Sequence, residues 1–479
     1  MVFTSVNFLL FFPLVAVLFY LTPVKYRWLT LLLVSYYFYI NIRPVYALLL
    51  GGITVSTYVF TRLMDNTPDD RVKKRYMVLN IVLILLPLFF FKYFGPVNEG
   101  ITGLLDKLHL RWPLPEIKLL LPVGISFYTF MAIGYTIDVY NEEIEAEKHF
   151  GIVALFISFF PLVLSGPIER AQNMFPQLNK PVDKVNFAGI VKGMKLMLWG
   201  YFMKLVVADR IALYVDVVFN DVSIQSGTTL LLSSILYPFQ VYADLGGYSL
   251  IAIGTARILG IEVMPNFKRP FFAVSMAELW RRWHISLITW ITDYIYKPLS
   301  FTFRKQGIWG IVLALLLAFF ISGIWHGAAL TFVAWGLLQG IFLSVEALLS
   351  GKRKLFEERN RLNRRWWYIL CTCILTFVLF SLTQVFARAS SLGNAVMVLK
   401  KIFTDHGGLY LDMTNLLYGL AGLGMLMLSD FRDEFFPERY LAFESNSKAV
   451  RYTSYIIIFY LIIFLGVSGD NTQFIYFKF

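Results

Sequence analysis

The sequence predicts an all-α, polytopic integral membrane protein, and three features of its composition support this fold class. Hydrophobic residues make up 58% of the 479 residues and charged residues 15%, where a soluble domain has about 25% charged residues. Mean hydropathy is +0.64. Aromatic residues reach 17%, with 45 Phe, 27 Tyr and 11 Trp. So few charges cannot cover a water-soluble surface, which excludes an ordinary cytosolic enzyme, a disordered chain and a disulfide-stapled secreted domain.

The net charge of +12 is gathered beside the apolar runs. Residues 1–64 contain four bases and no acid, and the segment 351–365 holds seven bases and two acids, a net charge of +5. Cytoplasmic loops of membrane proteins carry such an excess of bases. The distribution therefore favours membrane topology over nucleic-acid binding. The two cysteines, Cys371 and Cys373, lie inside an apolar run and imply neither a disulfide nor a metal site.

The elements that the sequence predicts are apolar runs near the length that a membrane-spanning helix needs. The first run, residues 6–21, has no base before it and no small-residue cleavage site after it, which predicts an uncleaved span rather than a signal peptide. Lys25 and Arg27 follow it, so the N-terminus is expected to face outward. Counting outward from the basic segment 351–365 puts the C-terminal tail outside as well. The other predicted spans are 28–42, 45–61, 76–94, 119–137, 150–166, 187–206, 366–387, 412–429 and 452–469.

The middle of the chain, residues 208–351, is less regular. Its apolar pieces are interrupted by polar, Gly and Pro residues, among them Asp244, Gly246, Gly247 and Pro265. Non-helical backbone at membrane depth is tolerated only where protein shields it or where it lines a cavity. The working site is therefore expected here, among re-entrant and interfacial helices. The whole fold is expected to contain about 11–13 transmembrane helices.

His326 is the most isolated ionisable residue of the chain, with no other between Lys305 and Glu346. An imidazole at such a depth is costly unless it faces a cavity or a partner. Gly323 and Gly327 form a small-xxx-small pair, so one interpretation is a packed helix in which His326 bonds a neighbouring helix. A functional imidazole is the other interpretation, and the periodicity does not decide between them.

His284 lies in an aromatic segment. Trp280, Trp283 and Trp290 recur at helical spacing, which predicts an amphipathic helix with an aromatic face. Five bases and two acids within residues 275–305 fit a helix at the level of the lipid headgroups. An interfacial anchor and a functional site are both compatible with this pattern.

The sequence contains no G-x-S-x-G elbow, no phosphate-binding loop and no dinucleotide fingerprint. The two histidines have no cluster of Cys, Asp or Glu at ligand spacing, so no metal site is predicted. A neutral imidazole in a dry environment suits general-base activation of a hydroxyl group. The residues alone therefore favour acid–base chemistry by histidine.

Six short motifs, in one order along the chain, make the sequence similar to a known family. They are Met1–Phe12 (MVFTSVNFLLFF), Leu121–Phe130 (LPVGISFYTF), Ile137–Tyr140 (IDVY), Ser165–Arg170 (SGPIER), Trp280–His284 (WRRWH) and Ser322–Gly327 (SGIWHG). With these motifs the chain resembles the membrane-bound O-acyltransferase family, and within it the bacterial branch that contains the alginate O-acetyltransferase membrane subunit. The resemblance covers nearly the whole chain.

The resemblance implies a single transmembrane domain over residues 1–479, with a catalytic middle at 208–351 around a central tunnel. It implies that His326 is the base acting on the attacking hydroxyl group, and that His284 assists by orientation or proton transfer. It implies no metal and no bound cofactor. Further substrate- or tunnel-associated residues that the resemblance implies are Trp325, Arg281, Arg282, Trp283, Asp244 and Arg170.

The C-terminal tail, residues 474–479, reads F-x-Y-x-x-F. It resembles the terminal motif of a small separate peptide in the related teichoic-acid D-alanylation system, in which the tyrosine is proposed to carry the acyl group. A covalent carrier role for Tyr476 and an aromatic interfacial anchor are the two interpretations. A phenol has a reference pKa near 10, so its ester transfers an acyl group more readily than a sugar ester does.

The function that the resemblance implies is transfer of an acetyl group across a bacterial inner membrane for O-acetylation of an exported polysaccharide. Acetyl-CoA is the expected donor, and an extracytoplasmic acetyltransferase is the expected partner. D-alanyl transfer to teichoic acid on the same scaffold and acylation of a lipid or protein are alternatives. A polysaccharide exporter is the alternative from another class. It would need a continuous polar path and an internal repeat, and no repeat is evident.

Overall fold

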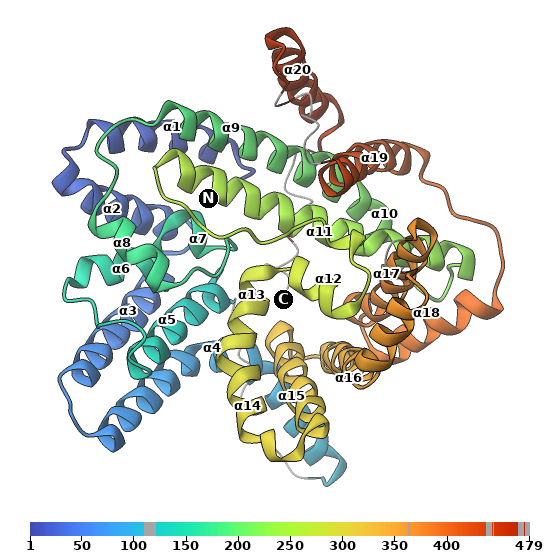
Figure 1. Cartoon of the computed structure of the whole chain (residues 1–479), viewed down its shortest axis with the longest axis horizontal. Coiled ribbons are helices and arrows are strands. Elements are labelled where there is room, and N and C mark those ends of the chain that lie inside the picture. The colour runs from blue at the N-terminus through green and yellow to red at the C-terminus, as the bar shows by residue number, and fades with distance from the viewer. Residues whose placement is uncertain (110–120, 363–364, 437–442, 444, 468–473, 475–479) are drawn as a thin grey trace. The chain divides into compact units, whose positions relative to one another are not determined.

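The structure is a computed structural model, and it describes residues 1–109, 121–362, 365–436, 443, 445–467 and 474. These residues form helices and connecting loops, without any β-strand among them (Figure 1). Six of the described helices are long and apolar enough to cross a membrane, which confirms the predicted all-α, multi-pass membrane fold. They are α3 (Pro44–Asp65), α4 (Asp70–Lys107), α15 (Ile308–His326), α16 (Leu330–Arg359), α17 (Trp366–Arg388) and α20 (Lys448–Leu465).

Five other predicted spans also form helices. They are α1 (Val6–Leu21), α2 (Arg27–Ile40), α5 (Ile125–Tyr140), α9 (Phe187–Tyr201) and α19 (Met413–Phe435). α1 begins after Ser5, whose hydroxyl oxygen accepts a hydrogen bond from the backbone N–H of Phe8 at 3.2 Å. Leu10 and Leu14 on its outer face are 65% and 71% exposed. Such an apolar outer face is expected of a helix that contacts lipid.

The span predicted at 150–166 is wrong. This segment forms two short helices, α6 (Phe150–Ser158) and α7 (Phe160–Val163). In one continuous helix the ring of Pro161 would clash with the carbonyl group one turn earlier. The chain turns instead, and the N–H of the residue before Pro161 donates to the hydroxyl oxygen of Ser35 at 3.1 Å. The hydroxyl group thereby satisfies a backbone donor at the break.

Contacts within the chain divide it into two compact units. The first comprises Met1–Met197 and Ile251–Met264, and the second comprises Leu198–Leu250 and Pro265–Phe479. In the first unit α3, α4 and α5 pack on one another, and α8 (Ala171–Asn179) packs on α6. The single domain expected over the whole chain stays a prediction.

The second unit contains the elements that position the candidate site. Within it α15 and α16 pack along each other and lie side by side in Figure 1. The unit also contains α17, α19 and α20. Its remaining described helices are α10 (Asp209–Asn220), α11 (Gly227–Ile258, as far as Leu250), α12 (Met276–Arg282), α13 (Ile285–Ile291), α14 (Lys297–Thr302) and α18 (Leu392–Thr404). Short 3₁₀ and π-helical turns complete the chain: η1 (Val24–Tyr26), η2 (Phe202–Ala208), η3 (Pro270–Phe272), η4 (Thr292–Tyr296) and η5 (Arg304–Gln306).

The middle of the chain is more helical than the sequence predicts. α11 continues unbroken through Asp244, Gly246 and Gly247, where interruptions are expected. Gly247 instead permits a close helix contact, because a Cβ atom there would lie 2.7 Å from the carbonyl oxygen of Gly200. The longest irregular stretch of this middle lies between α11 and α12, within residues 259–275.

Candidate active site

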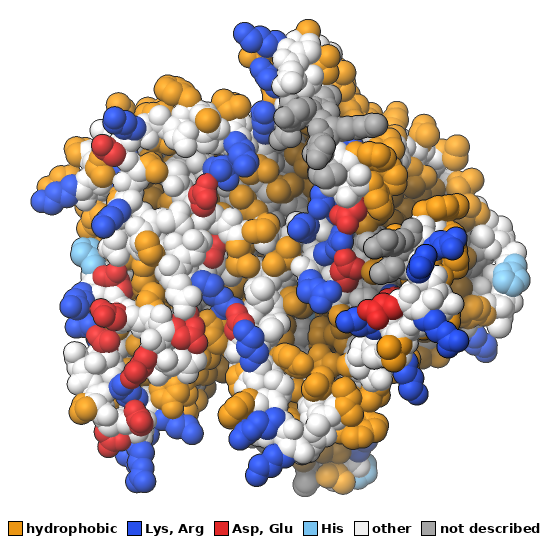
Figure 2. Space-filling view, in the orientation of Figure 1, with side chains coloured by type: hydrophobic (Ala, Val, Ile, Leu, Met, Phe, Trp, Pro, Cys, Tyr) orange, Lys and Arg blue, Asp and Glu red, His pale blue; other side chains and the backbone are white. Residues whose placement is uncertain are grey.

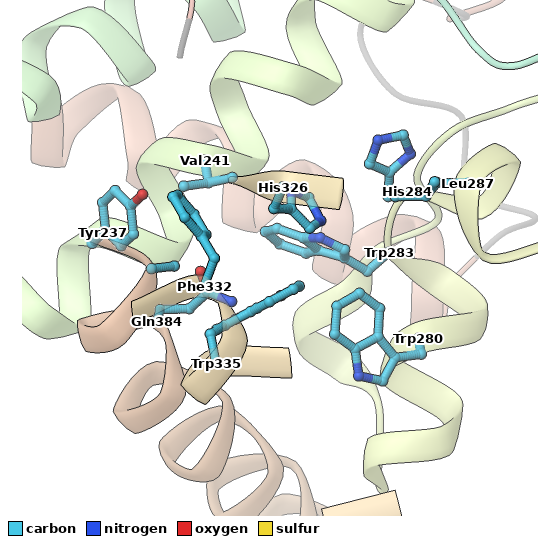
Figure 3. Close-up of a pocket in the computed structure, with 11 residues that line it drawn as sticks. Tyr237, Val241, Trp280, Trp283, His284, Leu287, His326, Phe332, Trp335 and Gln384 are labelled. Atoms are coloured by element: carbon cyan, nitrogen blue, oxygen red, sulfur yellow. The ribbon is translucent and has the colours of Figure 1, made fainter. Parts of the chain in front are cut away.

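His326 and His284 line one pocket in the second unit, and they reach it from different elements (Figure 3). His326 is the last residue of α15, and His284 lies between α12 and α13. The cavity has a volume of about 40 Å³, which is room for about three water molecules. The other residues that line it are Tyr237, Val241, Trp280, Trp283, Leu287, Phe332, Trp335, Gln384 and Ala387.

The backbone at His284 breaks the amphipathic helix that the sequence predicts. His284 has φ 46° and ψ 51°, a left-handed conformation that residues other than glycine rarely adopt. The N–H of Ile285 donates to the backbone carbonyl oxygen of Asn266 at 2.8 Å, which holds the turn. The single helix is therefore wrong. Trp280 and Trp283, which it would place on an interfacial face, are instead buried in the wall of the pocket.

Asn266 determines which nitrogen of the His284 ring carries the proton. The Oδ1 atom of Asn266 accepts hydrogen bonds from the backbone N–H of Ser286 at 3.3 Å and from its hydroxyl group at 2.9 Å. The Nδ1 atom of His284 lies 3.1 Å from the same oxygen, so Nδ1 is protonated and donates. The side-chain nitrogen of Asn266 donates in turn to Ser249 Oγ at 2.9 Å. The Nε2 atom of neutral His284 is therefore an acceptor.

Burial keeps the His284 ring neutral. His284 is 1% exposed, and it lies outside the helices that could span a membrane. Because burial penalises the charged ring, it lowers the pKa of His284 to about 3. A neutral imidazole with an accepting Nε2 atom can orient a hydroxyl group or take its proton.

His326 lies where α15 and α16 approach each other closely. A Cβ atom on Gly323 would lie 2.5 Å from the carbonyl oxygen of Phe332, so only glycine permits this approach. The half-buried His326 ring meets the Trp335 ring edge-on, with centroids 4.8 Å apart. Helix packing at Gly323 thus places His326 in the pocket.

Hydrogen bonds hold the aromatic wall of the pocket. The indole N–H of Trp280 donates to Gln339 Oε1 at 3.2 Å, and the side-chain nitrogen of Gln339 donates to Thr383 Oγ1 at 2.6 Å. This series links α12 to α16 and α17. Trp325 is buried and packs against His326 with centroids 4.7 Å apart, but it is not among the residues that line the pocket.

Three arginines that the resemblance implies are likewise not among the pocket-lining residues. Arg281 is exposed. Arg282 forms ion pairs with Glu278 at 2.6 Å and with Glu434 at 2.9 Å. Arg170 belongs to the first unit, where it immediately precedes α8. Their roles toward a substrate stay predictions.

Asp244 belongs to a buried ion cluster whose cation the sequence analysis does not single out. The Nζ atom of Lys204 lies 2.7 Å from Asp209 Oδ1 and 2.7 Å from Asp244 Oδ1. The three side chains are at most 4% exposed, and they join η2, α10 and α11. A base within the predicted span 187–206 is a signal in the sequence, but Lys204 shares it with Lys192 and Lys195. Asn266 gives no comparable signal.

The C-terminal tail touches the second unit through its first aromatic residue. Tyr476 lies outside the described residues. Phe474 is 3% exposed and stacks on Tyr248, with ring centroids 4.3 Å apart and an interplanar angle of 28°. Tyr248 is the neighbour in sequence of Ser249, which accepts the hydrogen bond from Asn266. The start of the tail is therefore anchored beside the residues that orient His284.

The two imidazoles are the pocket groups whose ordinary pKa lies nearest neutrality, so they are suited to proton transfer there. In the part of the chain that the structure describes, no three His, Cys, Asp or Glu side chains gather so as to hold a metal ion. The arrangement can support acid–base chemistry on a small group held against the aromatic wall.

Comparison with known proteins connects this pocket with acyl transfer. Residues 148–392 match the model of the membrane-bound O-acyltransferase family, MBOAT. The chain is 33% identical over 408 residues to the probable alginate O-acetylase AlgI of Pseudomonas aeruginosa, covering 84% of this chain and 75% of that protein. It is 32% identical over 400 residues to a peptidoglycan O-acetyltransferase of Helicobacter pylori, covering 78% and 72%. It is 26% identical over 309 residues to a teichoic acid D-alanyltransferase of Bacillus subtilis, covering 60% and 75%.

The family match contains every residue that lines the pocket, including both histidines. The relatives named as O-acetylase and O-acetyltransferase are covered over more than two thirds of their length. This chain therefore belongs to the membrane-bound O-acyltransferase family and is an O-acyltransferase.

Proposed function

We propose that this protein moves an acetyl group from acetyl-CoA across a bacterial inner membrane for O-acetylation of an exported polysaccharide. The observation that carries the proposal is the small aromatic pocket that His326 and His284 line together. Its cavity of about 40 Å³ holds only about three water molecules, which favours a small acyl group. The relatives named as alginate O-acetylase and peptidoglycan O-acetyltransferase support a glycan acceptor.

The proposed chemistry is attack of a hydroxyl oxygen on the thioester carbonyl carbon. His326 takes the hydroxyl proton as the new C–O bond forms and the C–S bond breaks. The proton then passes to the CoA sulfur, which leaves as a thiol. The accepting Nε2 atom of His284 orients the hydroxyl group in this scheme, because Asn266 and burial hold the ring in the required neutral form.

A relay through the tail is part of the proposal. Tyr476 accepts the acetyl group as an aryl ester on the outer side, and an extracytoplasmic acetyltransferase transfers it to the sugar. The stacking of Phe474 on Tyr248 supports this relay, since it fixes the chain two residues before Tyr476. A thioester, an aryl ester and a sugar ester form a downhill series, because the leaving groups become progressively more basic.

D-alanyl transfer to teichoic acid is the second candidate. The relatives named teichoic acid D-alanyltransferase support it, at a lower identity of 25–26%. The two candidates differ in the acyl group that the pocket must hold, since D-alanyl adds a methine carbon and an ammonium group to the acetyl framework. Labelled acetyl-CoA and a labelled D-alanyl thioester, offered to the same membranes, distinguish them directly.

The test is transfer of label from acetyl-CoA by membranes that contain the full chain. His326→Ala should lower transfer by about 10²-fold or more, because general-base catalysis contributes about that factor. His406→Ala is the matched control, since His406 is an exposed histidine of a loop. Full activity of His326→Ala in membranes that contain normal amounts of the protein would refute the proposed role of His326.

A further inference from the structure

A second and larger cavity lies in the second unit, between α17 and α19 and over η3 and α11. Its volume is about 730 Å³. Every residue that lines it is aromatic or aliphatic, apart from one methionine and one cysteine. Residues that define this apolar groove are Phe239, Phe271, Trp366, Cys373, Phe377 and Phe431.

The apolar groove is open to the outside of the protein. Trp366 is 76% exposed, Ile374 is 53% exposed and Phe431 is 45% exposed, and all three line the groove. α17 is one of the helices that could span a membrane. Between Trp366 and Phe377 it rises about 16 Å, which is close to the half-thickness of a bilayer core of about 30 Å. The groove therefore has the length of one leaflet.

One end of the apolar groove adjoins the basic segment 351–365. Trp366 follows Arg365 directly, and the segment carries a net charge of +5. Arg353 of the same segment donates to the carbonyl oxygen of Val274 at 3.0 Å, just after η3. In Figure 2 basic side chains, with acidic ones among them, lie beside apolar ones in the area where Figure 1 draws α16, α17 and α19.

The acidic residues near this end are engaged with bases. Glu357 pairs with Arg353 at 2.7 Å and accepts a hydrogen bond from Tyr368. On the α19 side, Glu434 pairs with Arg269 at 2.9 Å and with Arg282. The segment 351–365 has a net charge of +5 after its two acids are counted, and this excess is complementary to an anionic headgroup.

We propose that the apolar groove binds one acyl chain of an anionic phospholipid, with the headgroup phosphate beside Arg365. The one-leaflet length and the apolar walls fit a phospholipid acyl chain. The basic segment at one end selects an anionic headgroup over a zwitterionic one. The membrane lipid is then a specific ligand of this protein.

The bound lipid stabilises the aromatic wall of the pocket that His326 and His284 line. Phe271 lines the groove and contacts Trp283, with ring centroids 6.0 Å apart. Phe377 lines the groove and packs on Phe271 at 5.3 Å. Trp283 lines the pocket with His326 and His284. An acyl chain in the groove thus limits the movement of the aromatic rings behind Trp283.

Native mass spectrometry of the full chain, purified in a mild detergent, tests the proposal. Wild-type protein should retain one phospholipid, and phosphatidylglycerol should bind more tightly than phosphatidylcholine. Ile374→Trp fills the groove and should abolish retention. Leu375→Trp is the matched control, since Leu375 is 58% exposed on the same helix but does not line the groove. Equal retention by both variants would overturn the proposal. A wild-type protein that retains no phospholipid would also overturn it, and would make a partner protein the remaining occupant of the groove.

Substitutions of single basic residues test whether the groove selects an anionic headgroup. Arg365→Gln should weaken binding of phosphatidylglycerol about fivefold, the value expected for one base near an anionic surface, and leave phosphatidylcholine unaffected. Lys400→Gln is the control, because Lys400 is an exposed base of α18, which follows the opposite end of α17. Equal binding of both lipids by the wild-type protein would overturn the selection of anionic headgroups.

A third measurement needs no substitution. Cys373 lines the apolar groove, whereas Cys371 is exposed outside it. Phosphatidylglycerol should slow alkylation of Cys373 by N-ethylmaleimide and leave the rate at Cys371 unchanged. Equal rates at Cys373 with and without this lipid would contradict occupancy of the groove.

Discussion

The Nδ1 atom of His284 lies 3.1 Å from the Oδ1 atom of Asn266, and this contact determines the chemistry that the ring can perform. Asn266 also holds the left-handed turn at His284 through its backbone carbonyl oxygen, which accepts from Ile285. One residue therefore positions both the backbone and the proton of the second pocket histidine.

Replacing Asn266 by Asp should change the pH dependence of acyl transfer. A carboxylate beside Nδ1 stabilises the protonated ring, so the pKa of His284 should rise from the value of about 3 that burial produces. The neutral form is present above the pKa, so the acidic limb of the kcat/KM profile should move to higher pH. Activity should consequently fall more at pH 6 than at pH 8.

Asn266→Leu separates this effect from simple damage. It removes the acceptor altogether, so the free energy of unfolding should fall by about 1–3 kcal/mol at every pH. The acidic limb of the kcat/KM profile should not move. Ser249→Ala keeps the contact between Asn266 and His284 and should retain most activity. An unchanged acidic limb in Asn266→Asp would show that protonation of His284 does not control the reaction.

Replacing Lys204 by Met should destabilise the protein through its buried acids. Asp209 and Asp244 would then remain buried with no cation between them, which typically costs about 3–5 kcal/mol. The triple variant Lys204→Met, Asp209→Asn and Asp244→Asn should recover most of this loss, because no charge is left. Thermal unfolding in detergent measures both, with Lys400→Met as an exposed control. An unchanged unfolding temperature in the single variant would contradict the role of the cluster.

Replacing Gly323 by Ala should separate α15 from α16 and displace His326. The added methyl group would lie 2.5 Å from the carbonyl oxygen of Phe332, so the helices must move apart. Overpacking of this kind costs about 1–3 kcal/mol. Gly351→Ala is the matched control, since nothing lies within 4 Å of its added methyl group. It should be neutral or slightly stabilising. Equal unfolding temperatures and equal activities in the two variants would refute the close contact.

The long helices are predictable from the sequence because each one is a long apolar run that must match the thickness of a bilayer. That His326 faces a cavity or a partner is predictable for a related reason, since an ionisable group alone in such a run is otherwise costly. Both predictions depend on local sequence. Ionisable residues are rare in membrane-spanning segments, so one that occurs there is easily recognised in the sequence.

The orienting contact of His284 is not predictable in this way. Asn266 and His284 are separated by 18 positions, and helical spacing of the tryptophans predicts a continuous helix where the chain turns. The turn depends on backbone and side-chain hydrogen bonds from a distant loop, which override local periodicity. Lys204 and Asp244 are likewise brought together only by packing of η2 on α11.

The stacking of Phe474 on Tyr248 should be required for full transfer if the tail carries the acetyl group. The contact is worth about 0.5–1.5 kcal/mol beyond burial of the ring, and Tyr476 lies within about 7 Å of chain from it. Phe474→Ala and Tyr248→Ala should each lower transfer to the acceptor several-fold. The double variant should lower transfer little further, because both substitutions remove the same contact.

Tyr476→Phe should abolish transfer while keeping the aromatic ring, because it removes only the nucleophilic oxygen. Cleavage of labelled acetyl-CoA and label on the glycan are measured separately. Normal glycan labelling by Tyr476→Phe would assign the tail to anchoring alone and place the acceptor hydroxyl directly before His326.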